Sequence, residues 1–559
     1  MEYKMLPTEE TQVKNRYFSY NENAQLCVNH GESFDLQTPI STLLDQFSDK
    51  KNNEPCLLSF HHILKDKLKN LYQAFVNAID TFNYQSHYEF TYPIKVNPNI
   101  EIIQSLKSYA DDNNYKLNFE VGSKSEFLSI LSIASIDNKI ICNGFKDLNF
   151  YQIANFLGKV GYQIIMVIEH IDEVDLLKHF NINEIYFSIG LRLKPLLDDI
   201  HSAKFGLNLY EVNLARKEIA KLKLSDKVVL LHGHMGSQLK KIDETKKQIN
   251  HLVVLYKSLL ADFKNLKYID LGGGLPANYD YGDDLCYSFD YYAKNIINEL
   301  AYFADFCHIP HPVILTESGR AITADHSILI IHPVYQSLAK QKNDQLFDHS
   351  FQNAWLNGEI SLNDLKETVD NVHYLPQSQI HRLWYNFSVF QSLPDHWAIN
   401  QNFPLLPIED YSESSFICCE IFDISCDADG ILKQNNYDHL IQLPTNTIGT
   451  LAVMSVGSYQ EILGSKHNII GKTKKIDIDF DLLDNPYFDI KFAENHDNLM
   501  AQYGYDVASF HNHIKELMTQ YSKESLSDDQ YQFIATLTEQ SPYLSINFGE
   551  KDHENSLAG

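Results

Sequence analysis

The pattern of apolar and polar positions between residues 90 and 335 alternates short apolar runs with amphipathic helical stretches. A chain that repeats strand and helix in this way forms a parallel sheet. About eight such runs with intervening helices indicate a (β/α)8 TIM-type barrel, whose sites lie at the carboxyl ends of the strands. The expected strands are residues 90–96, 118–121, 139–142, 164–168, 184–193, 228–234, 268–271 and 312–317.

The flanking patterns predict further domains, because 559 residues are too many for one hydrophobic core. Apolar residues spaced three and four apart predict a helix over 64–79, ahead of the barrel. Polar, helix-like sequence follows the barrel, and β-rich sequence follows that. We therefore expect an N-terminal segment (1–88) with a lead-in helix and strands that join the β domain, the barrel (89–335), a helical insertion (336–385), a β-barrel or sandwich domain with the Cys426 loop (386–490), and C-terminal helices with a tail (491–559).

Composition and charge exclude several classes of protein. The formal net charge is -27 and no basic stripe is present, so no nucleic-acid partner is expected. No apolar run is long enough to span a bilayer, and the start lacks an apolar signal region. The eight cysteines form no C-x-x-C pair. We expect a cytoplasmic protein with reduced thiols and no membrane contact.

One lysine lies among apolar residues at the end of the first expected strand, in the stretch Tyr92-Pro93-Ile94-Lys95-Val96-Asn97-Pro98. Apolar burial lowers a lysine pKa, because desolvation disfavours the ammonium form. A neutral amine can form a Schiff base with a carbonyl cofactor. The alternative is a strand lysine whose ammonium reaches water. Polar residues at or near the other strand ends favour a site there: Glu120, Asn143, Glu169, Arg192, His234, Gly272 and Glu317.

Two further motifs follow expected strands. The glycines of residues 271–276 (LGGGLP) let backbone N–H groups approach a phosphate, although a tight turn would use the same residues. Residues 232–238 (HGHMGSQ) supply an imidazole that can stack on a flat ring and a hydroxyl for a phosphate. A zinc site needs at least three protein ligands and only two histidines are local, so no metal site is predicted.

Two motifs combine acids with another reactive group. Residues 316–320 (TESGR) place an arginine that suits a phosphate beside a carboxylate that suits a protonated ring nitrogen; an exposed salt bridge is the alternative. Residues 425–430 (SCDADG) lack the glutamate of a calcium loop. They predict either a turn or a reactive thiol beside acids.

Taken in order, these motifs resemble the alanine-racemase-type (fold III) pyridoxal-phosphate decarboxylases, and more closely the biosynthetic arginine decarboxylases. The resemblance runs from about residue 17 to the C-terminal helices. Its most specific pieces are residues 93–97 (PIKVN), 141–147 (ICNGFKD), 204–207 (KFGL), 234–238 (HMGSQ) and 317–321 (ESGRA), with 386–395 (NFSVFQSLPD) and 459–464 (YQEILG) typical of the long arginine type.

The resemblance implies roles for individual residues toward pyridoxal 5'-phosphate. Lys95 would hold the cofactor covalently, and His234 would stack on its ring. Glu317 would pair with the pyridine nitrogen and keep it protonated, so that the ring accepts electrons. The phosphate would be held by Ser237, Gly273, Gly274, Gly319, Arg320 and Tyr459, in a pocket lined by Glu120, Glu126 and Arg192.

The resemblance also implies how the substrate is handled. A homodimer or dimer of dimers would place active sites at the subunit interface. There Cys426 would reprotonate the product carbon, and Asp427 would position the amine of a small amino-acid substrate. Asp429, Asn278 and Tyr279 would also lie near the substrate. Magnesium is often associated with the arginine enzymes, but no motif here would bind it.

The implied reaction is α-decarboxylation of arginine to agmatine, in polyamine biosynthesis. One departure concerns Asn278, since the arginine enzymes usually read Gly-Val-Asp-Tyr where this chain reads Pro-Ala-Asn-Tyr over 276–279. A guanidinium offers only donors, whereas a ureido group also accepts from an amide. The alternative substrate is therefore citrulline, giving N-carbamoylputrescine. A non-catalytic relative, another fold III decarboxylase or racemase, and a sugar-phosphate barrel enzyme are further alternatives; the intact Lys95 and Cys426 argue against the first, and the chain length argues against the second.

Overall fold

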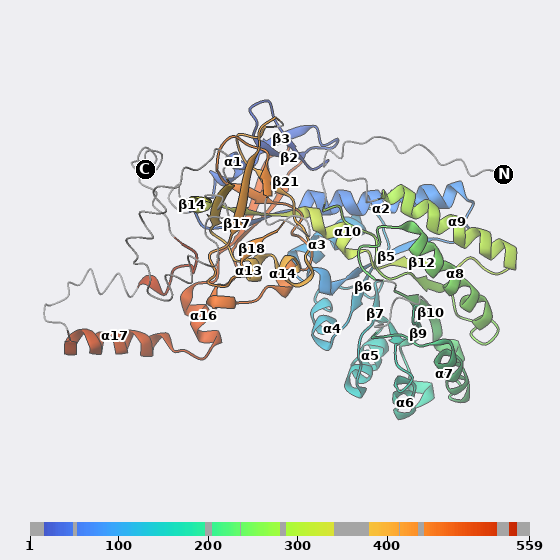
Figure 1. The fold of residues 1–559 in the computed structure, drawn as a ribbon. Helices are drawn as coiled ribbons and strands as arrows, with labels where there is room; N and C mark the ends of the chain where they lie inside the picture. The colour runs from blue at the N-terminus through green and yellow to red at the C-terminus, as the bar shows by residue number, and fades with distance from the viewer. Residues whose placement is uncertain are drawn as a thin grey trace, which may run out of the picture.

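The computed structural model describes residues 16–47, 53–195, 204–234, 236–279, 287–339, 380–412, 414–433, 441–521 and 536–544. Within these residues a closed barrel and a group of β-sheets lie side by side (Figure 1). The chain crosses between them more than once, because β4 (Cys56–Phe60) precedes the barrel in sequence but pairs with strands that follow it.

Eight parallel strands close the barrel, and each pairs with its neighbours in chain order until β12 returns to β5. The (β/α)8 fold class predicted from the sequence is thus confirmed. The strands are β5 (Tyr88–Pro93), β6 (Leu117–Val121), β7 (Lys139–Cys142), β8 (Gln163–Ile168), β9 (Ser188–Leu193), β10 (Val228–Gly233), β11 (Tyr268–Asp270) and β12 (Val313–Thr316).

Amphipathic helices cover the outside of the barrel (Figure 1). The predicted lead-in helix is α2, whose apolar stripe of Leu64, Leu68, Leu71 and Phe75 is buried against the barrel. The others are α3 (Ile100–Asp112), α4 (Lys124–Ile130), α5 (Leu148–Val160), α6 (Glu173–Leu176), α7 (Leu209–Lys221), α8 (Ile242–Leu259) and α9 (Phe289–Cys307), with α2 spanning His61–Thr81. This apolar layer fixes the strands, and so fixes the side chains at their ends.

The second region is built from sheets with their own apolar cores. One sheet has the order β16 (Leu405–Pro407), β20 (Leu451–Val453), β13 (Ser327–Ile331), β4, β21 (Lys474–Phe480) and β22 (Pro486–Lys491). Another has the order β14 (Pro333–Ala339), β15 (Ile380–Tyr385), β17 (Ile417–Phe422) and β18 (Ile431–Leu432), with β19 (Ile441–Leu443) paired to β17. A three-stranded sheet contains β1 (Phe18–Tyr20), β2 (Leu26–His30) and β3 (Leu36–Pro39), followed by α1 (Ile40–Leu44).

The predicted helical insertion over 336–385 is wrong at both ends. Residues 336–339 belong to β14 and residues 380–385 form β15, and the two strands pair antiparallel. Residues 340–379, the rest of that prediction, lie outside the described residues. The physical reason is long-range pairing, because strand formation here depends on a partner about forty residues away and not on local periodicity.

Five short α-helices and one longer one lie after the barrel strands in the described chain. They are α10 (Gly319–Thr323), α13 (Val389–Ser392), α14 (Pro394–Ile399), α15 (Gln460–Leu463), α16 (His496–Gln502) and α17 (Val507–Tyr521). The last of these extends away from the sheets (Figure 1). Among the helices that the structure describes, none is long and apolar enough to cross a membrane.

Candidate active site

A layer of polar side chains lies at the carboxyl ends of the barrel strands, directly above an apolar layer. The apolar layer contains Ile141, Val167, Leu230, Tyr268 and Leu315. Two residues further along the same strands come Asn143, Glu169, His232, Asp270 and Glu317, all buried. Because side chains alternate across a strand, both sets point toward the barrel interior. The polar layer is therefore the floor of a site at the mouth of the barrel.

Lys95 lies in a short 3-10 turn, Ile94–Val96, immediately after β5. Its Nζ donates to Oε2 of Glu120 at 2.8 Å, and its side chain is 48% exposed toward the mouth. Burial lowers the pKa of Lys95, but the carboxylates of Glu120 and Glu317 outweigh burial, so the pKa is raised overall. The prediction that apolar surroundings lower this pKa was wrong in the net direction, because sequence proximity did not reveal the two acids.

Asn143 connects the acids on either side of the lysine. Its amide nitrogen donates to Oε1 of Glu120 at 3.1 Å and to Oε1 of Glu317 at 2.9 Å. Burial, followed by the charges of Asp270 and Glu120, raises the pKa of Glu317 well above its usual range. The amide thus holds two carboxyl groups in fixed positions around the lysine nitrogen.

The other walls of the site carry Arg192 and His234. Arg192 pairs with buried Glu169 at 2.5 Å. The backbone N–H of Gly273 donates to Nδ1 of His234 at 3.2 Å, so the imidazole proton lies on Nε2. Burial, with the positive charges of Arg192 and Lys95, lowers the pKa of His234 to about 3. His234 is therefore a neutral ring, as stacking on a heteroaromatic cofactor requires.

Glycines follow two of the barrel strands at the mouth. Gly272 has a φ of 65° and Gly274 a φ of 119°, conformations that L side chains rarely adopt. A Cβ on Gly319 would lie 2.6 Å from Cγ of Pro93, so only glycine lets the last barrel turn approach the lysine segment. Ser237 lies in the adjoining turn, where Gln238 is hydrogen-bonded to the backbone of Ala277.

Arg320 is held beside this turn by three side chains. Its Nη1 donates to Oη of Tyr279 at 3.0 Å and lies 3.3 Å from Oδ2 of Asp395, and its guanidinium lies 4.5 Å from the ring centre of Tyr459. Tyr459 is joined to the lysine segment by a bond from its N–H to the carbonyl of Val96. Tyr279 is buried, and its hydroxyl oxygen helps to hold Arg320, the arginine that suits a phosphate. A substrate contact for Tyr279 and its neighbour Asn278 stays a prediction.

Glu126 lies in the first turn of α4, close enough to Glu120 and Lys95 for their charges to affect its pKa. Its Oε2 accepts from the N–H of Gly122 at 2.6 Å, at the start of α4. Burial raises its pKa, with a further contribution from Glu120. Its expected place in the cofactor pocket stays a prediction.

The loop after β17 carries Cys426, Asp427 and Asp429 on the surface. The Cys426 thiol accepts from Nδ2 of Asn468 at 3.1 Å, and the Asp427 carboxylate lies 3.3 Å from Nε2 of His467. The N–H of Asp429 donates to Asp427 at 3.0 Å. Among the described residues no hydrogen bond or ion pair joins this loop to Lys95 of the same chain. Its predicted roles at the site of a partner subunit stay predictions.

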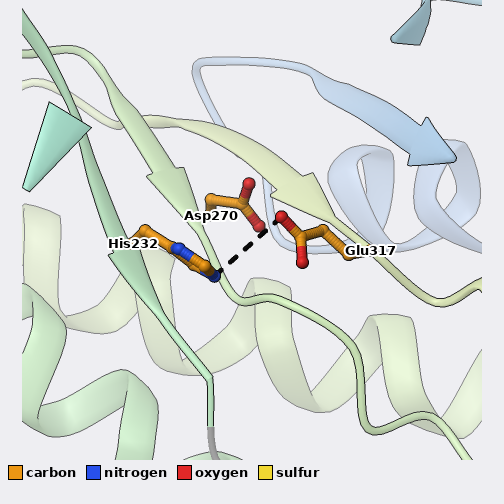
Figure 2. A group of neighbouring side chains, drawn as sticks. All are labelled: His232, Asp270 and Glu317. Carbon is orange, nitrogen blue, oxygen red and sulfur yellow. Dashed lines mark ion pairs between the residues drawn. The ribbon is translucent and has the colours of Figure 1, made fainter. Parts of the chain in front are cut away.

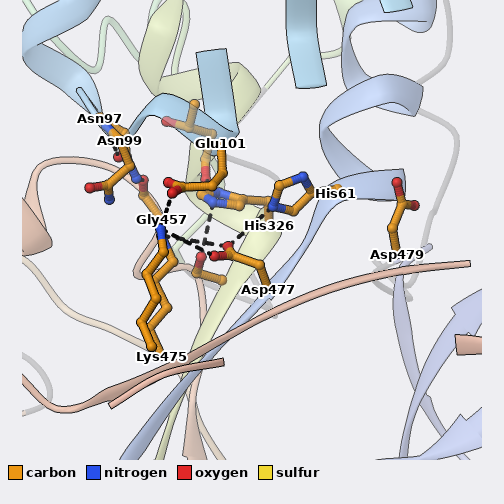
Figure 3. A network of polar contacts seen from close by, with 12 residues as sticks. His61, Asn97, Asn99, Glu101, His326, Gly457, Lys475, Asp477 and Asp479 are labelled. Atoms are coloured by element: carbon orange, nitrogen blue, oxygen red, sulfur yellow. Dashed lines mark hydrogen bonds and ion pairs between the residues drawn. The ribbon is translucent and has the colours of Figure 1, made fainter. Parts of the chain in front are cut away.

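A polar network supports the lysine segment from behind (Figure 3). Asn97 donates to the carbonyl of Gly457 at 3.0 Å and to Oε1 of Glu461 at 3.1 Å. Glu461 lies 3.3 Å from Nζ of Lys475, which lies 3.6 Å from Asp477. The network thus connects β21 of the sheet region to the turn that presents Lys95.

Asn143, His232 and Asp270 belong to the site although the sequence patterns predict no role for them. Asn143 lies near an expected strand end, His232 begins the motif that contains His234, and Asp270 falls inside the expected strand 268–271. The signal that identifies all three is the period of two, since each follows a buried apolar residue of the inner layer by two positions.

Pyridoxal phosphate fits the unpaired polar atoms of this site. Buried atoms without a hydrogen-bond partner among the described residues include Nε of Arg192, Oδ2 of Asp270, Oδ1 of Asn143 and Nε of Arg320. The site offers two kinds of group: the buried carboxyl groups of Asp270 and Glu317, and the backbone of a glycine turn with Arg320. A ring nitrogen suits the first and a phosphate suits the second.

Comparison with known proteins agrees with this geometry. The family model for the pyridoxal binding domain of pyridoxal-dependent decarboxylases matches residues 66–324. The biosynthetic arginine decarboxylase of Prochlorococcus marinus (strain MIT 9515) is 30% identical, over 84% of this chain and 85% of that protein. That of Vibrio cholerae is 28% identical, over 90% of this chain and 92% of that protein. The crystal structure of the biosynthetic arginine decarboxylase from Campylobacter jejuni superposes with a TM-score of 0.81 and 26% identity, covering 95% of this chain and 98% of that one.

Proposed function

The chain belongs to the biosynthetic arginine decarboxylase family, and from this premise we propose that it uses pyridoxal phosphate to convert arginine to agmatine and carbon dioxide. The single observation that supports this most strongly is the arrangement around Lys95. The Lys95 nitrogen, the carboxyl groups of Glu120 and Glu317 and the bridging amide of Asn143 meet at the mouth of the barrel. The relatives of this chain are named biosynthetic arginine decarboxylases.

The residues of the site suit the chemistry of this cofactor. When bound, pyridoxal phosphate supplies an aldehyde that condenses with amines and a ring that accepts the electron pair left by departing carbon dioxide. Lys95 would hold the aldehyde carbon. Its ammonium must first lose a proton, and the carboxylate of Glu120 at 2.8 Å is placed to accept it. His234 would lie against the ring face, and Glu317 would pair with the ring nitrogen.

The phosphate end follows from the same geometry. The backbone of Gly273 and Gly274 and the hydroxyl of Ser237 would donate to phosphate oxygens, as would Nε of Arg320, which has no partner among the described residues. Gly319 and Tyr459 hold this end close to the lysine segment through their contacts with Pro93 and Val96. Glu126 and Arg192 would complete the walls.

We place the substrate between two subunits. Cys426 and Asp427 are exposed, and among the described residues neither has a hydrogen bond or ion pair with Lys95, so a homodimer that brings this loop to a partner's barrel would complete the site. Cys426 would then protonate the product carbon, while Asp427 and Asp429 would hold the substrate's basic end, near Asn278. The described cysteines are free thiols, which suits a cytoplasmic enzyme of polyamine biosynthesis.

Citrulline is the less favoured substrate. The relatives compared above are named for arginine. Asn278 lies between Ala277 and Tyr279, two buried residues that contact Gln238 and Arg320. Asn278 therefore lies beside residues that support Arg320, the residue expected to hold the phosphate. Its amide gives no reason to expect a substrate with a ureido group. Magnesium has no support in the comparisons or in the donor groups described.

A substrate comparison tests the proposal. Carbon dioxide release is measured from arginine, citrulline and ornithine at equal concentrations, with the purified enzyme and added pyridoxal phosphate. The proposal expects kcat/KM for arginine to exceed the others by at least about tenfold, a barrier difference of about 1.4 kcal/mol. Equal or faster release from citrulline or ornithine would refute arginine as the substrate while leaving the family assignment intact.

A further inference from the structure

Three buried groups lie together behind the ring-nitrogen end of the site: His232, Asp270 and Glu317 (Figure 2). They come from β10, the end of β11 and the residue after β12. His232 and Asp270 are direct register partners across the strands, so their side chains lie at one level of the barrel. One side-chain nitrogen or oxygen atom of each residue lies within 4.8 Å of those of the other two. Nε2 of His232 is 3.9 Å from Oε1 of Glu317.

The hydrogen bonds in this group are incomplete. Oδ1 of Asp270 accepts from the N–H of Gly272 at 2.8 Å, but Oδ2 has no donor among the described residues. Neither ring nitrogen of His232 has a partner there either. Two ionised carboxylates cannot hydrogen-bond to each other, whereas one proton between them supplies the missing donor. Buried acids this close hold one proton as a pair, because two negative charges without solvent repel strongly.

Building on the proposed function, we propose that Asp270 is a positioning residue that stores a proton for Glu317. When a protonated ring nitrogen lies against Glu317, the negative charge of the pair moves to Glu317 and the shared proton moves to Asp270. The ring nitrogen takes its own proton from solvent, so the pair keeps one proton and one negative charge throughout. Protonated Asp270 then donates to Glu317 and aims its carboxylate at the ring.

His232 closes the group from the third side as a neutral ring. Burial, followed by the positive charge of Arg192, lowers the pKa of His232 well below its usual range, so the ring does not compete for the proton. Burial raises the pKa of Asp270 to about 7, which agrees with a stored proton. The other charged or titratable groups that face these three are Lys95, Glu120, Lys146, Arg192 and His234.

The test replaces Asp270 with asparagine, which mimics the protonated acid, and with leucine, which cannot donate. An acid with a raised pKa in the folded state contributes stability at low pH, and that stability is lost as pH rises through about 7. In the cofactor-free enzyme, the unfolding temperature of the wild type should therefore fall between pH 5 and 8 by about 2 °C more than that of Asp270→Asn. The surface variant Asp290→Asn should follow the wild type.

Cofactor binding gives the second readout. Titration with pyridoxal phosphate, followed by visible absorption, should show Asp270→Leu at least about tenfold weaker than Asp270→Asn, because only the amide can donate to Glu317. The proposal is overturned if Asp270→Asn keeps the wild-type pH dependence, if it binds cofactor as weakly as Asp270→Leu, or if the cofactor-free enzyme takes up one zinc ion that Asp270→Asn cannot bind.

The two readouts separate this inference from the proposed function. If Asp270→Leu fails to fold, the pH comparison of wild type with Asp270→Asn still decides. If the wild type neither binds pyridoxal phosphate nor releases carbon dioxide from arginine, the proposed function fails, while the cofactor-free unfolding data still show whether the buried pair holds a proton.

Discussion

Asp477 should stabilise the fold and the lysine segment together. It is buried on β21, 3.1 Å from Nε2 of His61 and 3.6 Å from Nζ of Lys475. Burial would raise its pKa, but the hydrogen bond with His61 and the charge of Lys475 outweigh burial and lower it from 3.8 to about 2. That difference corresponds to about 2 kcal/mol of stability, which is present above the unfolded pKa and lost as pH falls through about 2.

The perturbation is Asp477→Asn, which keeps the side-chain shape and removes the charge. Lys475 would also lose one of its two carboxylate partners and keep only Glu461, so urea unfolding at pH 7 should show about 2–4 kcal/mol less stability than the wild type. The matched control is Asp489→Asn, because Asp489 is the exposed register partner of Asp477 on β22. A loss below about 0.5 kcal/mol, or an equal loss in the control, would refute this account of the network.

Three smaller predictions follow from other contacts. Gly319→Ala should destabilise the enzyme by about 1–3 kcal/mol in thermal unfolding, because the new methyl would overlap Pro93; unchanged stability would contradict the close approach. Asn143→Ala should weaken pyridoxal phosphate binding by about tenfold in an absorption titration, since Glu120 and Glu317 lose their shared donor; wild-type affinity would argue against that bridge. Cys426→Ser should lower kcat at least about tenfold with KM for arginine little changed, because the thiol is assigned to the protonation step; an unchanged kcat would remove it from the mechanism.

The barrel could be predicted because its information is local. Short apolar runs predict the strands, and apolar residues at helical spacing predict the helices between them. The position of the strand ends follows from that order. Lys95 shows the limit of this reasoning, since the expected strand ran through it to residue 96 whereas β5 ends at Pro93 and the lysine lies in the next turn. Its neighbours in sequence are apolar and give no sign of Glu120 and Glu317, which lie at the ends of other strands and raise its pKa.

The unpredicted parts depend on partners that are distant in the chain. β14 and β15 pair across the intervening segment, and neither has a local pattern that requires a strand. His232 and Asp270 meet Glu317 only because neighbouring parallel strands align them. The surface loop with Cys426 is the opposite case: its motif suggested chemistry, but among the described residues no hydrogen bond or ion pair joins the loop to the barrel of the same chain.

The most direct test of the account is the role of Lys95. The measurement compares wild type, Lys95→Arg and the surface control Lys178→Arg for the visible absorption band with pyridoxal phosphate and for carbon dioxide release from arginine. Lys95→Arg keeps the charge beside Glu120 but cannot hold the aldehyde. We predict that Lys95→Arg loses the band and at least about a thousandfold in kcat/KM, while Lys178→Arg behaves as the wild type. A Lys95→Arg enzyme that keeps the band and releases carbon dioxide at the wild-type rate would contradict the account.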